Sequence, residues 1–225
     1  MYRVRSEAEF PVIFHHAGVG ALGNGTLKTG LHVVSSCDYH IDVFLNDMST
    51  DTLIVSFSAA LSNDVVNLPA FQGLGLARRA GQSCLAVSDP SLENTDSDIG
   101  WCLGRRGRQT VEEDLVKTIR EFQFELGVKR LLFFGASGGG YAAILVGRHF
   151  EDSMILCVNP RLNFLGKPRV NLRRTYGKLT DDKDWETTPS RTILEAMPSA
   201  FELISRRLSG DLFVFQNTGD EVFYN

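Results

Sequence analysis

Gly135-Ala136-Ser137-Gly138-Gly139 is the stretch of sequence that decides the fold. The apolar residues 129–134 precede it, and the small and apolar residues 141–146 follow it. The order strand, Gly-x-Ser-x-Gly, helix is the context of a nucleophile elbow, where a serine stands on a sharp turn after a strand. Glycines allow strand and helix to cross closely, and free N–H groups at the helix start face a developing oxyanion. Ser137 is therefore the predicted catalytic nucleophile; the alternative is a glycine-rich turn whose serine only caps the helix.

Length and composition indicate one α/β domain with a full core, because 225 residues leave little room for two. The net charge of −4, with both signs interspersed, favours neither nucleic acid nor an anionic membrane as a partner. No run is long enough for a membrane span, and the first residues lack the apolar stretch of a signal peptide. No cofactor is predicted. The cysteines are far apart and lack metal-ligand spacing, which predicts reduced thiols and a cytoplasmic location: Cys37, Cys84, Cys102 and Cys157.

Strands and helices alternate from residue 52 onward, which predicts a mostly parallel central sheet with helices on both faces. Apolar runs predict buried strands at 52–58, 84–87, 129–134 and 154–158 and a last strand at 212–215, preceded by an antiparallel pair at 31–35 and 39–45. Spacing and capping signals predict helices at 69–79, at 110–126, from the serine turn to about residue 149, and after Pro189 with a break at Pro198.

Residues 1–30 are expected to form a flexible N-terminal segment with a short strand at 10–14. The pair His15-His16 is followed by glycines and has no third ligand at a useful spacing, so a solvated loop is predicted in place of a metal site. His40 beside Asp42 resembles half of a catalytic triad, but the polar face of an edge hairpin explains the pair more simply.

The alternation around Ser137 resembles the α/β-hydrolase superfamily over residues 31–225, predicted to form a single domain. In that family the nucleophile precedes the acid and the histidine along the chain, with the histidine after the last strand. Ser137 follows the fifth predicted strand and Asp220 the seventh, so the resemblance implies Asp220 as the catalytic acid. It also implies an oxyanion hole from the N–H groups of Gly138 and of Ser58 or Ala59. The alternative for Asp220 is a turn aspartate that accepts its own backbone N–H groups.

A finer resemblance rests on Phe-Gly-Ala-Ser-Gly-Gly-Gly, Ser88-Asp89-Pro90 and the Trp101 loop. These stretches are faintly similar to bacterial serine hydrolases of surface-polysaccharide or accessory-secretion systems. The chain departs from the family in that no histidine follows Asp220, so the last strand and the catalytic-histidine loop are missing from it. Either the sequence is a shortened form of a working hydrolase, or the domain no longer catalyses. The intact serine turn and the Asp220 turn favour the first explanation.

The predicted function is a serine hydrolase that cleaves a carboxylic ester of a small molecule or glycan through an acyl-enzyme. An acyltransferase would use the same groups with an alcohol in place of water. The second hypothesis is a catalytically inactive binding or assembly module, with self-association through the exposed last strand. Residues 159–188 occupy the family's usual lid position. Their arginines are candidates for binding an anionic substrate, with a solvated surface as the alternative: Arg169, Arg173 and Arg174.

Overall fold

A computed structural model of the chain describes residues 3–23, 27–36, 39–93, 95–104, 110–162, 176–177, 183–184, 186–188, 198–206, 210–217 and 219. The strands are β1 (Val4–Arg5), β2 (Ile13–His16), β3 (Gly30–Ser35), β4 (His40–Asn46), β5 (Thr52–Phe57), β6 (Asn67–Leu68), β7 (Ser83–Val87), β8 (Arg130–Ala136), β9 (Met154–Val158) and β10 (Asp211–Phe215). The helices are α1 (Leu74–Arg79), the short 3-10 turn η1 (Pro90–Leu92), α2 (Thr110–Leu126), α3 (Gly138–Gly147) and α6 (Ala200–Arg206).

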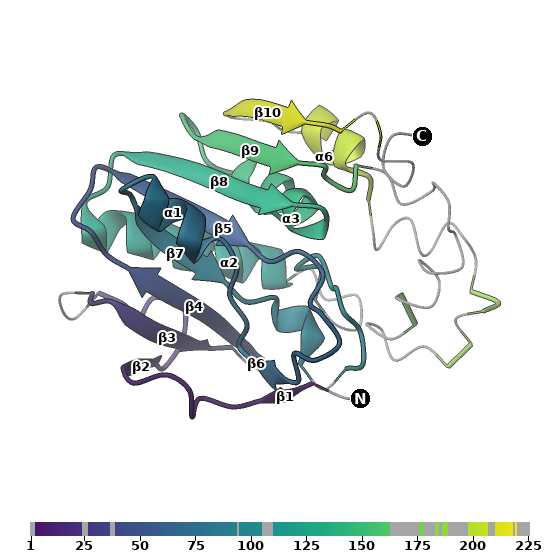
Figure 1. The fold of residues 1–225 in the computed structure, drawn as a ribbon, viewed down its shortest axis with the longest axis horizontal. Coiled ribbons are helices and arrows are strands. Elements are labelled where there is room, and N and C mark those ends of the chain that lie inside the picture. Colours follow the sequence, from purple (N-terminus) through teal and green to yellow (C-terminus); the bar gives the residue numbers. More distant parts are fainter. Residues whose placement is uncertain are drawn as a thin grey trace.

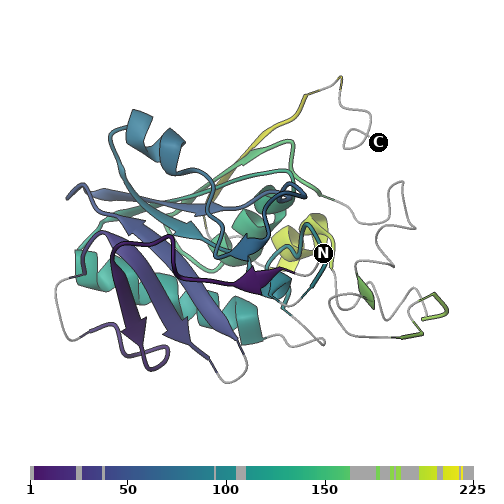
Figure 2. The same ribbon diagram turned by 60° about the horizontal axis from the view of Figure 1, so that its bottom comes forward.

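Eight of these strands form one twisted sheet in the order β10-β9-β8-β5-β7-β4-β3-β2 (Figure 1). Within the described residues, only the pairs that β4 makes with β3 and β7 are antiparallel in this sheet. The remaining pairs are parallel, so the prediction of a mostly parallel sheet is confirmed. The strands β1 and β6 form a separate two-stranded sheet, with β1 drawn in purple in Figure 2.

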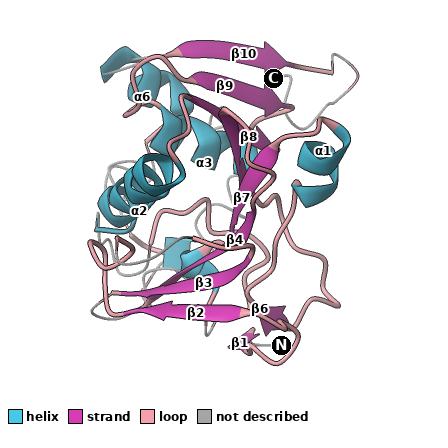
Figure 3. Cartoon of the chain, turned by 90° about the vertical axis from the view of Figure 1, so that its left-hand side faces the viewer, coloured by secondary structure: helices cyan, strands magenta, loops and turns pink. Residues whose placement is uncertain are grey.

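Helices lie on both faces of the large sheet, as the alternation predicted. Figure 3 shows the sheet from its side, with α2, α3 and α6 on one face and α1 on the other. All ten residues of α3 are buried, which agrees with a helix that has no polar face. The helix α2 turns its periodic apolar residues into the same core: Val111, Leu115, Ile119 and Phe122. None of the helices in the described parts of the chain has the length and apolar character needed to cross a membrane.

The first helix begins later than its sequence pattern predicts, at Leu74. Two hydrogen bonds hold the preceding residues away from helical geometry: Ala70 N donates to Ser88 Oγ at 3.1 Å, and Ser56 Oγ donates to the Gln72 carbonyl at 2.7 Å. Gly73 then turns the chain with a φ of +91°, a conformation that favours glycine. Residues 189–197 of the last predicted helix lie outside the described part, and α6 begins two residues after Pro198.

The prediction that His15 and His16 occupy a solvated loop is wrong, because both belong to β2. This strand pairs in parallel with β3, and His16 Nε2 lies 3.0 Å from Nδ1 of the buried His32. The two imidazole rings are stacked, with their centroids 5.3 Å apart. Contacts with β3 therefore hold β2 on the sheet. That the domain begins after residue 30 stays a prediction.

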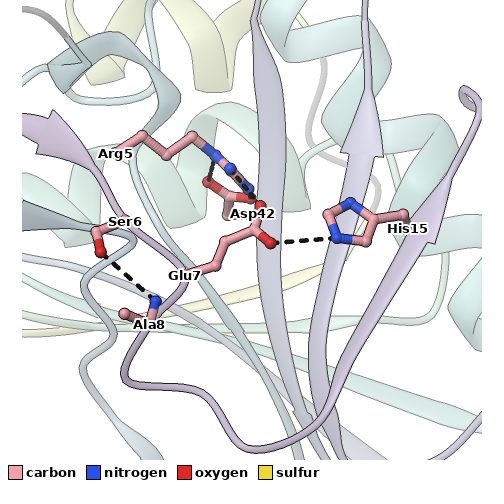
Figure 4. A network of polar contacts seen from close by, with 6 residues as sticks. All are labelled: Arg5, Ser6, Glu7, Ala8, His15 and Asp42. Atoms are coloured by element: carbon pink, nitrogen blue, oxygen red, sulfur yellow. Dashed lines mark hydrogen bonds and ion pairs between the residues drawn. The ribbon is translucent and has the colours of Figure 1, made fainter.

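Asp42 does not lie on the polar face of an edge hairpin, since β4 is an interior strand between β3 and β7. Arg5 covers its carboxylate through Nε and Nη2, at 3.1 and 2.7 Å (Figure 4). Burial opposes the guanidinium charge, but these hydrogen bonds and the charge of Asp42 outweigh burial and raise the pKa of Arg5. Arg5 also donates to Glu7, whose second oxygen lies 3.1 Å from His15 Nε2. Asp42 is thus part of an N-terminal ion-pair network.

Arg3, the first described residue, is also buried, with 4% of its surface exposed. Its backbone N–H donates to the Thr95 carbonyl at 2.8 Å, and its guanidinium donates to the carbonyls of Ser97 and Ser62. Arg3 is therefore fixed to the loop that follows β7.

Candidate functional site

Ser137 lies between the end of β8 and the start of α3, in a backbone conformation that non-glycine residues rarely adopt. Its φ is +52° and its ψ is −120°. Three hydrogen bonds fix this conformation: Ser137 N donates to the Val158 carbonyl at 3.0 Å, while Gly140 N and Arg161 N donate to the Ser137 carbonyl at 3.2 and 3.0 Å. The strand, strained turn and helix predicted around Ser137 are therefore all present. Residues 135–140 are called the serine turn below.

The glycines on either side of Ser137 let the helix begin in contact with two strands. A Cβ at Gly135 would stand 2.0 Å from the carbonyl oxygen of Gly139. A Cβ at Gly139 would stand 2.5 Å from the Phe57 carbonyl oxygen, at the end of β5. Both distances are far inside van der Waals contact, so the crossing depends on the absence of these side chains, as the sequence predicts.

A strained φ of +52° at a serine carries an energetic cost that a glycine would not have. We expect Ser137→Gly to raise the free energy of unfolding by about 1 kcal/mol, measured by urea denaturation. Ser137→Ala removes the same hydroxyl but keeps a Cβ, so it should leave the strain in place and serves as the control. Equal stability of the two variants would contradict the presence of strain at this position.

The loop after β7 covers the first residue of α3, which was not foreseen from sequence. A Cβ at Gly138 would lie 1.9 Å from Ile99 Cδ1 and 2.9 Å from Trp101 Nε1. Trp101 is 8% exposed and has a φ of +54°. Ile99 and Trp101 thus form an apolar wall over Gly138.

Asp89 holds the loop that carries this wall. Its carboxylate accepts the N–H groups of Ser91, Gly100 and Cys102 at 2.9, 3.0 and 3.2 Å. Burial raises the pKa of Asp89, although these hydrogen bonds favour the ionised form. In the sequence, Ser88-Asp89-Pro90 indicates only a faint resemblance. In the structure its aspartate positions the loop over Gly138.

One of the predicted oxyanion donors, Gly138, belongs to the serine turn, and the others follow β5. Gly138 opens α3, and no acceptor for its N–H is found among the described residues. Ser58 and Ala59 follow β5, whose end touches the start of α3 through Gly139. The N–H of Ala59 donates to Gln72 Oε1 at 3.0 Å, so this predicted donor already has an acceptor in the structure.

Asp220 lies outside the described residues, as do Arg169, Arg173 and Arg174. The end of β10 near Asp220 is described: Asn217 N donates to Asn159 Oδ1 at 2.7 Å, and Gly219 N donates to Asn217 Oδ1 at 2.9 Å. The chain after β10 is therefore held beside the residue that follows β9. Of the basic 159–188 segment, Arg161 contacts the serine turn through its backbone, and burial lowers its pKa.

All five histidines of the chain are described, and none lies beside Ser137. His149 follows the far end of α3, where its Nε2 lies 2.5 Å from Glu112 Oε1. His40 is at the same sheet edge as Ser137, but β4 lies three strand positions from β8, or roughly 14 Å. His32 and His15-His16, on β3 and β2, are still further along the sheet. In the described parts of the chain, no three His, Cys, Asp or Glu side chains are grouped to hold a metal ion.

Comparison with known proteins links this architecture to a known fold. No family model matches the sequence, and no curated protein matches it by sequence. Among solved structures, an acylaminoacyl peptidase from Pyrococcus horikoshii aligns with a TM-score of 0.54 at 13% identity, over 86% of this chain and 32% of that one. The chain has the α/β-hydrolase fold.

Two other structures share the α/β-hydrolase architecture of this chain. The Glycosylation Associate Protein (Gap123) complex from Streptococcus agalactiae aligns with a TM-score of 0.58 at 15% identity, over 83% of this chain and 35% of that one. A capsule O-acetyltransferase from Neisseria meningitidis serogroup A aligns with a TM-score of 0.50 at 12% identity, over 87% of this chain and 89% of that one. The chain thus spans about a third of the length of the peptidase and Gap123 chains. At these identities the likeness concerns the fold.

Proposed function

We propose that the protein is a serine-dependent acyl-transfer enzyme that cleaves a carboxylic ester of a small molecule or glycan. The observation that carries the proposal is the strained backbone of Ser137, held by three hydrogen bonds between a central strand and a helix N-terminus. Strain of this kind persists where the surrounding structure over-determines it and function requires it. This conformation, at the carboxyl end of β8, supports the proposal that the half-buried Ser137 is the nucleophile.

In the proposed reaction, Ser137 Oγ attacks the ester carbonyl and its proton passes to a base. The tetrahedral oxyanion is held by the N–H of Gly138 and by that of Ser58 or Ala59, with Gln72 Oε1 displaced from Ala59. The base returns the proton to the alcohol as the bond to it breaks, which leaves an acyl-enzyme. Water then attacks the acyl group and gives a proton to the base, and the base returns it to Ser137 Oγ as the acid leaves. Asp220 is proposed to orient the base. The arginines of the 159–188 segment, Arg169, Arg173 and Arg174, are proposed to bind an anionic part of the substrate.

The base is proposed to come from outside residues 1–225, because all five histidines lie far from Ser137. Without a base, a serine is a weak nucleophile, and the turn and oxyanion donors alone supply only a residual rate. The same residues would serve an acyltransferase if an alcohol replaced water. The shared fold of the capsule O-acetyltransferase supports this alternative reaction.

A non-catalytic binding or assembly module is the second candidate, favoured by the distance of every histidine from Ser137. The shared fold of the Gap123 complex supports the proposal that such a module works in a protein assembly. For either function we propose a cytoplasmic location, because Cys84, Cys102 and Cys157 are free and buried, as suits a reducing compartment.

Labelling by a fluorophosphonate probe tests the proposal, with and without added imidazole as a substitute base. We expect slow labelling of the chain alone, acceleration by imidazole of at least tenfold, and no labelling of Ser137→Ala in either condition. Ser91→Ala, which alters a buried serine in the loop after β7, controls for labelling elsewhere. Absence of labelling in the presence of imidazole would overturn the enzymatic proposal and favour the binding module.

A further inference from the structure

The peptide unit between Ser137 and Gly138 carries the N–H group that is proposed to hold the oxyanion. This unit is planar, so fixing the Ser137 carbonyl also fixes the direction of the Gly138 N–H. Gly140 N and Arg161 N donate to that carbonyl at 3.2 and 3.0 Å. The ψ of −120° at Ser137 belongs to a strained conformation, which a rotation of the peptide unit would relieve. A restraint on the Gly138 side therefore adds to these two hydrogen bonds in keeping the donor in place.

The apolar wall of Ile99 and Trp101 is this second restraint. The two side chains fill the space beside Gly138 where a side chain of its own would stand, with Ile99 Cδ1 1.9 Å and Trp101 Nε1 2.9 Å from the position of a Cβ. Both belong to the main hydrophobic core or pack against it, so they resist displacement. Gly138 is buried beneath them. A hydrogen-bond donor that is shielded from water on one side also stabilises a developing negative charge more strongly.

Asp89 holds the backbone on both sides of Trp101. Its Oδ2 accepts the N–H groups of Gly100 and Cys102 at 3.0 and 3.2 Å. Trp101 and Cys102 have φ values of +54° and +56°, which side chains rarely adopt. Such strain persists where the surrounding contacts over-determine it, and these two hydrogen bonds are contacts of this kind. The placement of the indole over Gly138 thus depends on the buried carboxylate of Asp89.

We infer, on the basis of the proposed function, that Asp89 is a positioning residue for the oxyanion donor. It acts through Ile99 and Trp101, which hold the Gly138 N–H in the direction of the oxyanion and shield it from water. Both oxygens of Asp89 accept backbone N–H groups of its own loop, so this carboxylate is committed to the loop and not to an incoming base. Asp220 is proposed to orient the base, whereas Asp89 acts on the opposite partner of the reaction, the oxyanion.

The fluorescence of Trp101 tests whether Asp89 holds the wall. The chain has one other tryptophan, so Trp185→Phe leaves Trp101 as the single reporter. In this background we expect Asp89→Ala to shift the emission to longer wavelength and to increase quenching by acrylamide, because the buried indole becomes exposed. Asp42→Ala is the matched control, since Asp42 is also a buried carboxylate but binds Arg5 (Figure 4), and it should leave the emission unchanged. Unchanged emission in Asp89→Ala would overturn the inference.

The rate of fluorophosphonate labelling tests whether the wall acts on the oxyanion donor. Labelling over a range of probe concentrations, with imidazole present, separates the limiting rate from the affinity for the probe. We expect Asp89→Ala to lower the limiting rate about tenfold or more and to leave the affinity nearly unchanged, because one oxyanion donor is worth roughly 10²–10³ in rate and acts in the transition state. Asp42→Ala should lose stability but keep the wild-type labelling rate. This difference separates positioning from a general loss of stability.

Ile99→Ala decides the question if Asp89→Ala does not fold. It keeps Asp89 and its hydrogen bonds but removes a contact with Gly138, so we expect the limiting rate to fall about threefold or more. Leu103→Ala is its control, because Leu103 is a half-buried apolar residue of the same loop that packs against the same core. The wild-type limiting rate in Ile99→Ala, or in a folded Asp89→Ala, would overturn the inference alone. A wild type that is not labelled at all would overturn the proposed function as well.

Discussion

Replacing Gly135 by alanine is expected to lower the free energy of unfolding by more than about 4 kcal/mol, or to prevent folding. The added Cβ would lie 2.0 Å from the Gly139 carbonyl oxygen and 2.6 Å from Gly140 N. These are backbone atoms at the start of a helix that is buried along its whole length, so no flexible side chain can move aside. Urea denaturation followed by far-UV circular dichroism measures the loss.

Gly75→Ala is the control for this substitution. Gly75 lies in α1, where an added Cβ meets nothing within 4 Å, so alanine should stabilise the helix by about 0.5–1 kcal/mol. If Gly135→Ala lowers the free energy of unfolding and Gly75→Ala raises it, the effect on stability depends on the position of the glycine and not on its loss as such. A Gly135→Ala variant as stable as the wild type would refute the close crossing at the serine turn.

Stability should fall as the pH is lowered from about 6.5 to about 4, because His32 must become charged inside the protein. Its ring is 1% exposed, lies 2.9 Å from the Lys28 carbonyl through Nε2, and packs against Phe14 and Phe122. Burial lowers its pKa to about 4. Since the unfolded chain binds this proton more tightly, the stabilisation present above pH 6.5 is lost on acidification, at a cost on the order of 3 kcal/mol.

Urea denaturation across this pH range, for the wild type and for His32→Gln, isolates the contribution of His32. Glutamine keeps a hydrogen-bond donor but does not titrate, so the difference in pH dependence between the two proteins belongs to His32. The neighbouring His16 has its pKa lowered by burial and acts in the same direction, whereas the raised pKa of the buried Asp89 acts in the opposite one. Parallel curves for the wild type and His32→Gln would contradict the prediction.

The centre of the fold could be predicted because its signals are local. The apolar run at 52–58 appears as a buried strand, the run at 154–158 appears as a strand that buries only Ile155 and Cys157, and α2 has the bounds that its periodicity and flanking signals indicated. The serine turn could be predicted because glycines must stand on both sides of Ser137, where the strand and the helix cross too closely for a Cβ. In each case the residues that determine the structure stand next to one another in the sequence.

The parts that could not be predicted depend on contacts between distant residues. The strand β2 contains His15 and His16 and lacks a clear apolar alternation; it forms because it pairs with β3 and because His16 stacks on His32. The two-residue strands β1 and β6 are too short to produce any periodic pattern. The placement of Ile99 and Trp101 over Gly138 depends on three hydrogen bonds to Asp89, and no spacing rule in the sequence announces such bonds.

The buried Arg3 also has a consequence for how the molecule is made on the ribosome. Its partners, the carbonyls of Ser62, Thr95 and Ser97, are synthesised about sixty to ninety residues later. Arg3 has its full set of native partners only after the loop that follows β7 has left the exit tunnel. During translation, β1 must therefore wait for β6 and this loop, so this strand is held in place only after a large part of the domain exists.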